Sequence, residues 1–164
     1  MTEWKKDKEW SDRFLPAIKR ILGEYLISEP PVEEDAERNT DLIVLRLDAV
    51  RIACRVRTFE YLTSYGNEFT IRSGRPSGVK TELTKIIEGW GEYLFYGFSD
   101  KDELKLAKWI LGDLRALRLY INRNLCQNKK PWIEKLNRDN SSSFVAFRYK
   151  NIPNFLVATS ESTN

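Results

Sequence analysis

The stretch DLIVLRLDAVRIACRVR at residues 41–57, with EFTIRSGR at residues 68–75, decides the predicted fold. Residues 41–47 are mainly Leu, Ile and Val, which predicts a buried strand. From residue 50 to residue 56 apolar and charged side chains alternate, which is typical of a half-buried strand. A third run, residues 69–72, follows a short segment that contains glycine and asparagine, and this segment predicts a turn. Three consecutive strands joined in this way predict an antiparallel meander.

Length and composition are those of one globular domain. The chain has 164 residues, of which 41% are hydrophobic and 31% charged. These values predict a single domain over residues 1–164, with a substantial core and a frayed tail at residues 159–164. The net charge of +3 at pH 7 permits a nucleic-acid partner but does not require one.

Missing residue types exclude several classes of chemistry. The sequence contains no histidine and two cysteines, Cys54 and Cys126. Histidine-based catalytic triads, disulfide frameworks and zinc clusters are therefore excluded. The sequence shows no secretory signal pattern and no apolar run of about 18 residues, so we expect a cytoplasmic protein without a membrane span.

The segment before the meander predicts a helix. Its apolar side chains recur at helical spacing between residues 4 and 27. The helix is expected to begin near Ser11 or Leu15, because Pro16 fits a first helical turn but not an interior one. Glu24 lies at the border of the apolar face and can approach whatever the helix packs on, although a solvated position is the simpler interpretation.

The chain after the meander predicts two helices and three strands. In order, these are a helix at residues 81–90, an aromatic strand at 92–98, a long helix at 104–123, and a pair of short strands at 144–148 and 155–158. Ser77 or Gly78 is expected to cap the first helix. The sequence of residues 100–103 resembles a capping box and predicts the start of the long helix.

The order helix, three-stranded meander, helix, strand resembles the core of the PD-(D/E)XK (restriction endonuclease-like) nuclease superfamily, an α/β fold. Members carry an acid on the first core strand, a (D/E)-x-K element on the second and, in many cases, a glutamate on the preceding helix. This chain resembles that pattern with Asp41, with ACRVR at residues 53–57 and with Glu24. The segments ERNTDLIVL, RIACRVR, EFTIRSGRPSG and TELTKI also look like small phage- or prophage-borne proteins of the superfamily.

The resemblance implies a hydrolase that cleaves DNA phosphodiester bonds with Mg²⁺ or Mn²⁺. On this interpretation Asp41 and Glu24 hold the metal ion. Arg55 or Arg57 takes the lysine position and stabilises phosphate charge, and water is the nucleophile. The resemblance also admits a homodimer, because many enzymes of this fold work as dimers.

The motif departs from the family pattern at its second acid. If Arg55 takes the lysine position, Ala53 stands where the acid belongs. If Arg57 takes that position, Arg55 occupies the place of the acid, and a cation there repels the metal. A second carboxylate would then have to come from Glu24, Glu34 or Glu68. Asp41 itself has an alternative role as a strand-entry turn or cap.

Basic residues are grouped along one continuous part of the chain. By the period-two rule Arg51, Arg55 and Arg57 share one strand face, where they form either a phosphate-binding strip or a structural network with facing acids. Four more candidates for nucleic-acid binding follow, namely Arg72, Arg75, Lys80 and Lys85. The sequence therefore predicts binding of nucleic acid, most concretely DNA, along this segment.

Two other interpretations keep the fold without the chemistry. One is a catalytically inactive protein of the nuclease fold that binds DNA or a host or phage protein. The other is a structural subunit that binds a protein partner through exposed aromatic residues and an acidic loop. Salt-sensitive DNA binding without metal separates the first interpretation from the second.

Overall fold

The computed structural model describes residues 3–28, 43–44, 50–75, 78–137 and 142–161. The fold is mixed α/β, and the chain divides into two compact units, Met1–Ala49 and Val50–Asn164. The single domain expected from the sequence stays a prediction.

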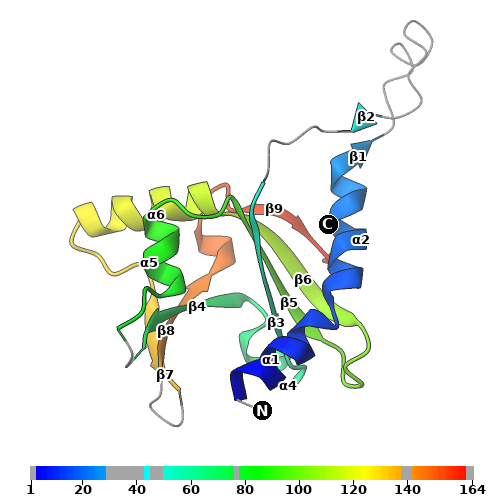
Figure 1. Ribbon diagram of the computed structural model, residues 1–164. Coiled ribbons are helices and arrows are strands. Elements are labelled where there is room, and N and C mark those ends of the chain that lie inside the picture. The colour runs from blue at the N-terminus through cyan, green and yellow to red at the C-terminus, as the bar shows by residue number, and fades with distance from the viewer. Residues whose placement is uncertain (1–2, 29–42, 45–49, 76–77, 138–141, 162–164) are drawn as a thin grey trace, which may run out of the picture. The chain divides into compact units, whose positions relative to one another are not determined.

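The first unit contains two helices and a small antiparallel sheet. Its elements are α1 (Glu3–Asp12), α2 (Leu15–Leu26), β1 (Ile27–Ser28) and β2 (Ile43–Val44), and the two strands pair with each other (Figure 1). The expected helix start at Leu15 is confirmed, and Pro16 lies in the first turn, where its missing N–H removes no helical bond. The strand predicted at residues 41–47 is described only over β2.

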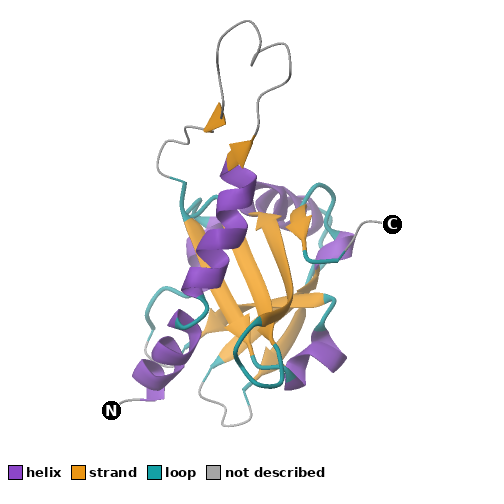
Figure 2. Ribbon diagram, turned by 90° about the vertical axis from the view of Figure 1, so that its right-hand side faces the viewer, coloured by secondary structure: helices purple, strands orange, loops and turns teal. Residues whose placement is uncertain are grey.

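The second unit contains two larger sheets and three α-helices (Figure 2). The four-stranded sheet consists of β3 (Ile52–Arg57), β5 (Tyr93–Ser99), β6 (Leu106–Asp113) and β9 (Leu156–Thr159), in that order. The three-stranded sheet consists of β4 (Glu68–Gly74), β8 (Ser143–Arg148) and β7 (Ile133–Leu136), in that order. The helices are α4 (Glu60–Tyr65), α5 (Glu82–Ile87) and α6 (Leu114–Cys126). A 3-10 turn, η1 (Tyr149–Asn151), follows β8.

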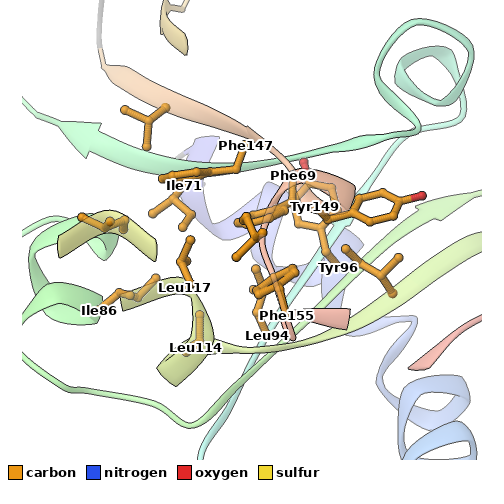
Figure 3. Packing of buried hydrophobic residues seen from close by; sticks show 14 of the residues in the cluster. Phe69, Ile71, Ile86, Leu94, Tyr96, Leu114, Leu117, Phe147, Tyr149 and Phe155 are labelled. Carbon is orange, nitrogen blue, oxygen red and sulfur yellow. The ribbon is translucent and has the colours of Figure 1, made fainter. Parts of the chain in front are cut away.

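The core of the second unit is built by side chains from both sheets and from α6 (Figure 3). At its centre Phe69 stacks on Phe147 at 5.4 Å and on Phe155 at 4.8 Å between ring centroids. Leu117 and Ile121 of α6 are fully buried in the same cluster. The aromatic stack therefore joins β4 and β8 to the segment that leads into β9.

The predicted meander is wrong, because β3 and β4 belong to different sheets. β3 pairs in parallel with β5, from Ile52 opposite Tyr93 to Arg57 opposite Phe98. The connection from β3 to β4 is not a tight turn but contains the six-residue helix α4. Parallel strands need a long connection, and here the chain from β3 to β5 includes α4, β4 and α5.

The long helix predicted at residues 104–123 is also wrong in its first half, which forms β6. The carboxylate of Asp100 accepts hydrogen bonds from the backbone N–H groups of Leu104 at 2.8 Å and Lys105 at 3.1 Å. Asp100 thus closes the β5–β6 hairpin loop instead of capping a helix. The helical part begins at Leu114, after Asp113 accepts a hydrogen bond from the backbone N–H of Arg115 at 2.7 Å.

The two C-terminal strands do not pair with each other as the sequence predicted. β8 lies between β4 and β7, a strand that was not predicted, whereas β9 pairs with β6. The expected frayed tail is described up to Glu161, whose carboxylate lies 2.5 Å from Lys108 Nζ. The backbone N–H of Ser160 donates to the carbonyl of Trp109 at 3.0 Å. Residues 162–164 lie outside the described residues.

The cap predicted for α5 is wrong as well. Thr81 is the N-cap, and its hydroxyl oxygen accepts a hydrogen bond from the backbone N–H of Thr84 at 3.3 Å. Gly78 lies three residues earlier with a φ of 67°, and Ser77 lies outside the described residues. Threonine at the N-cap position provides a hydrogen-bond acceptor for a backbone N–H group that has no partner within the helix.

Replacing Asp113 by alanine tests the cap of α6. Loss of an N-cap costs about 0.5–2 kcal/mol, so we expect the free energy of unfolding to fall by about 1 kcal/mol at pH 7. Burial opposes ionisation of Asp113, but hydrogen bonds from Arg115 outweigh it and hold the pKa of the carboxyl below its ordinary value. Urea denaturation followed by circular dichroism measures the change.

The matched control is Asp113→Asn, which keeps a capping side chain but removes the charge. Because the folded pKa is depressed, the stabilising effect of the charge is fully present above the unfolded pKa of about 3.9. It is lost as the pH falls through the folded pKa. The stability difference between the native protein and Asp113→Asn should therefore shrink in acid, and a difference independent of pH would contradict this role.

Candidate nucleic-acid interface

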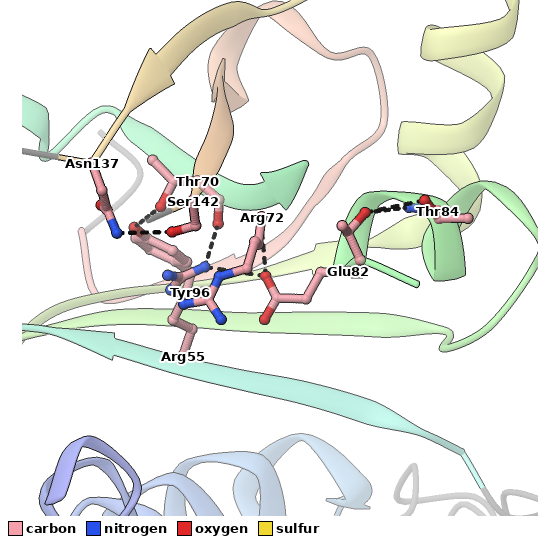
Figure 4. Close-up of polar contacts among 9 residues, drawn as sticks. Arg55, Thr70, Arg72, Glu82, Thr84, Tyr96, Asn137 and Ser142 are labelled. Carbon is pink, nitrogen blue, oxygen red and sulfur yellow. Dashed lines mark hydrogen bonds and ion pairs between the residues drawn. The ribbon is translucent and has the colours of Figure 1, made fainter. Parts of the chain in front are cut away.

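An arginine–glutamate pair joins three elements on one side of the second unit (Figure 4). Arg55 of β3 donates from Nη1 to Glu82 Oε2 of α5 at 3.1 Å and to the backbone carbonyl of Thr70 in β4 at 3.3 Å. The same Glu82 oxygen accepts the backbone N–H of Arg72 at 3.0 Å. The Glu82 carboxylate thus offsets the charge of Arg55, whose position relative to β4 and α5 is fixed.

A cleft of about 540 Å³ lies next to this pair, and Thr70 forms part of its lining. Its aromatic lining residues are Tyr61, Tyr65, Tyr96, Phe98 and Phe144. Its charged lining residues are Arg57, Lys135, Glu60 and Glu68. The volume falls within the range of small-molecule sites, which is about 300–1,000 Å³. We call it the tyrosine–cation cleft, because Tyr61 and Tyr65 in its wall each pair with a cation.

Two tyrosines of α4 each carry a cation over the ring. Arg57 Cζ lies 4.1 Å from the ring centroid of Tyr61, and Lys135 Nζ lies 4.0 Å from that of Tyr65. The two tyrosines are four residues apart on the helix, which places them on one face, and their ring centroids are 6.2 Å apart. Tyr61 is 40% exposed and Tyr65 is 41% exposed. Both tyrosines are therefore partly accessible, and each ring has a positive charge over one face.

The floor of the cleft is held by buried and bonded groups. Tyr96 is 3% exposed, and its hydroxyl lies 3.0 Å from Thr70 Oγ1. Glu68 accepts a hydrogen bond from Lys135 Nζ at 3.2 Å, and its other oxygen lies 3.5 Å from Arg148 Nε. These contacts fix the position of Lys135 relative to β4. Because the lining contains two acids and two cations, its net charge is close to zero.

Of the two acids expected to hold a metal, one lies within the described residues. Glu24 is exposed on α2 of the first unit, whereas Asp41 and the alternative ligand Glu34 lie outside the described residues. Within the described ranges, no three Cys, Asp or Glu side chains are grouped so that they could hold a metal ion. The metal role of Asp41 and Glu24 stays a prediction.

The basic residues predicted to bind nucleic acid do not share one environment. Arg55 and Arg57 share one face of β3, on which they lie opposite Tyr96 and Phe98 of β5. The backbone N–H of Arg51, just before the strand, donates to the carboxylate of Glu92 at 2.6 Å.

The remaining basic candidates do not line the tyrosine–cation cleft. Arg72 lies on β4 next to Glu82, and Arg75 is exposed after that strand. Lys80 forms an ion pair with Glu88 at 2.7 Å, and Lys85 is exposed on α5. Of the basic candidates, Arg57 is the one that lines the cleft, and Glu68, a possible second carboxylate, lines it as well.

Three of the four residues in the two cation–ring pairs were missed by sequence reasoning. Tyr61 and Tyr65 have the four-residue spacing of a helical pair, but this signal needs the helix between the strands to be recognised. Lys135 is carried by β7, which the sequence did not predict. β7 is an edge strand of the three-stranded sheet, and β8 lies between it and β4. From there the Lys135 side chain reaches Glu68 of β4 and the cleft.

Within the described part of the chain, no helix is long and apolar enough to cross a membrane. Comparison of the chain with family models, with curated proteins and with solved structures gave no significant match.

Proposed function

We propose that this protein binds nucleic acid, most concretely DNA, through the tyrosine–cation cleft. The observation that carries the proposal is the pairing of two accessible tyrosine rings with Arg57 and Lys135 in one concave site. Aromatic rings stack on bases, at about 1–3 kcal/mol per base, and cations beside them contact phosphate oxygens. On this proposal the chain keeps a nuclease-like fold and uses it for binding.

The order of elements in the second unit supports the nuclease-like part of the proposal. β3, β4, α5 and β5 follow one another as second strand, third strand, helix and fourth strand would in the restriction endonuclease-like core. The separation of β3 and β4 into two sheets removes the meander on which the resemblance was partly based, so the order of elements alone supports this part of the proposal. The connection between the two strands contains α4, which carries Tyr61 and Tyr65 of the cleft.

Arg57→Ala tests the proposal in a binding titration with a fluorescent DNA strand of 20 nucleotides, either alone or annealed to its complement. We expect the native protein to bind at least one form and Arg57→Ala to bind it at least fivefold more weakly, because a phosphate-contacting cation is lost. Two phosphate contacts, one for each cation of the cleft, predict that affinity falls about 7-fold for the single strand and about 12-fold for the duplex between 50 and 200 mM salt. Fluorescence anisotropy measures each affinity.

Lys129→Ala is the matched control, since Lys129 is exposed and does not line the cleft. It removes the same charge and should leave DNA affinity unchanged within about twofold. Absence of binding to both DNA forms at 50 mM salt would contradict the proposal. Equal weakening by Lys129→Ala and Arg57→Ala would also contradict it, because binding would then follow net charge.

A second candidate is the Mg²⁺- or Mn²⁺-dependent nuclease expected from the resemblance. One observation favours it, namely that Glu82 supplies a carboxylate beside Arg55, where the sequence motif lacks its second acid. The described residues alone do not fit a metal site. Adding either metal to the same titrations and analysing the DNA on a denaturing gel distinguishes the candidates. Cleavage by the native protein but not by Asp41→Ala would establish the nuclease, and intact DNA in every lane would favour binding alone.

A further inference from the structure

We infer that the tyrosine–cation cleft selects unpaired bases, so that its ligand is single-stranded DNA. This inference rests on the proposed function and specifies the form of the nucleic acid. It depends on where the rings of Tyr61 and Tyr65 lie, how much of them is accessible and what charge surrounds them.

The rings of Tyr61 and Tyr65 lie in a concave site. A protein reads duplex DNA by inserting a helix or a ribbon into a groove, where only base edges are presented. The faces of paired bases are covered by their neighbours, and a base must be extruded before its face can contact a ring. Because Tyr61 and Tyr65 line a cleft of about 540 Å³, a base has to project into the cleft to stack on them. Bases of a single strand do so without extrusion.

The two rings have accessible surface that the other tyrosine of the cleft lacks. Tyr61 and Tyr65 are 40% and 41% exposed, whereas Tyr96 is 3% exposed. Tyr96 also has its hydroxyl 3.0 Å from Thr70 Oγ1. The planar guanidinium of Arg57 lies over one face of the Tyr61 ring, so a base that approaches from that side stacks on the guanidinium and not on the ring. The stacking platform therefore consists of α4 and the end of β3.

The charge of the lining gives no advantage to the duplex. Duplex DNA carries one negative charge per about 1.7 Å of axis, against one per about 3.4 Å for each strand, so a strongly basic surface favours it. In the cleft, Glu60 and Glu68 offset Arg57 and Lys135. Attraction to the denser polyanion is consequently weak, and stacking decides which form binds.

The test compares three fluorescent ligands of equal length at 100 mM salt, using the full chain and anisotropy. The ligands are a 12-nucleotide thymidine strand, the same strand annealed to its complement, and a strand with abasic sites throughout. We expect the thymidine strand to bind at least tenfold more tightly than either of the others. The abasic strand keeps the phosphates and removes the bases, so it isolates the effect of stacking.

The variants separate ring stacking from the tyrosine hydroxyl. The double substitution Tyr61→Leu with Tyr65→Leu should weaken thymidine-strand binding about fivefold or more, as expected for loss of at least one stacked base. Tyr61→Phe with Tyr65→Phe keeps both rings and should retain the native affinity. Circular dichroism confirms that each variant is folded.

The outcomes distinguish this inference from the proposed function. If the duplex binds as tightly as the thymidine strand and Arg57→Ala weakens both, the single-strand preference is overturned while the proposed function stands. If the leucine variant keeps the native affinity, the stacking platform is overturned. If none of the three ligands binds, both the inference and the proposed function fail.

Discussion

Replacing Phe155 by alanine is expected to lower the free energy of unfolding by about 3–5 kcal/mol. The Phe155 side chain is 0% exposed, and its ring stacks on Phe69 at 4.8 Å with an interplanar angle of 15°. Phe69 in turn stacks on Phe147. Alanine leaves a cavity at one end of this stack, and the rigid strands on either side limit its collapse. Guanidinium denaturation followed by circular dichroism measures the change.

Val157→Ala is the control for the alanine at Phe155. Val157 lies two residues further along the chain on β9 and is 51% exposed, so its truncation should change the free energy of unfolding by less than about 0.5 kcal/mol. A loss below about 1 kcal/mol for Phe155→Ala would contradict the central place given to the aromatic stack. A comparable loss for Val157→Ala would attribute the effect to β9 instead.

Gly112→Ala is expected to destabilise the protein by about 3 kcal/mol, the upper part of the range for overpacking. A Cβ atom at Gly112 would lie 2.1 Å from Cζ of Phe155, with two further ring carbons at 2.5 and 2.6 Å. The Phe155 ring cannot move away freely, because Phe69 packs against it. The methyl group and the ring therefore compete for the same space, and thermal unfolding should show a lower Tm.

The double variant Gly112→Ala with Phe155→Ala tests that explanation. Without the Phe155 ring the clash is absent, so adding Gly112→Ala to Phe155→Ala should cost less than about 1 kcal/mol. The two substitutions are then strongly non-additive, as expected for groups in contact. If the alanine at Gly112 costs as much without the ring as with it, the backbone of β6 and not the Phe155 contact is the reason for the glycine.

Local patterns predicted several strands, but they missed β6 and β7 and did not predict which strands pair. Alternation identified β3 and the aromatic run identified β5, yet no pattern in either segment indicates that the two pair in parallel. Pairing depends on contacts between distant segments, such as the stack of Phe69 on Phe155. Such contacts leave no periodic signal in either stretch.

The helix predicted at residues 104–123 shows why short apolar runs are ambiguous. Leu114, Leu117 and Ile121 have helical spacing and are buried on α6. Extending the same spacing backwards included Leu104, which is 79% exposed in the hairpin loop. The Gly112–Asp113 step marks the true boundary, because Asp113 provides the cap that a helix start needs.

The candidate site could be predicted only in part. The period-two rule placed Arg55 and Arg57 on one face of β3, as the register with β5 confirms. Pairing of Arg55 with Glu82 could not be predicted, since it depends on how α5 returns to β4. Lys135 joins the cleft through the sheet order β4-β8-β7, which the sequence does not encode locally.

The most direct test of the account is to map where single-stranded DNA touches the protein. A strand that contains 5-iododeoxyuridine is bound, irradiated and digested, and the crosslinked residue is identified by mass spectrometry. The account predicts crosslinks to Tyr61 or Tyr65, because the photoreactive base stacks on those rings. Crosslinks to Trp90, which is 61% exposed and does not line the tyrosine–cation cleft, with none to either tyrosine, would contradict it.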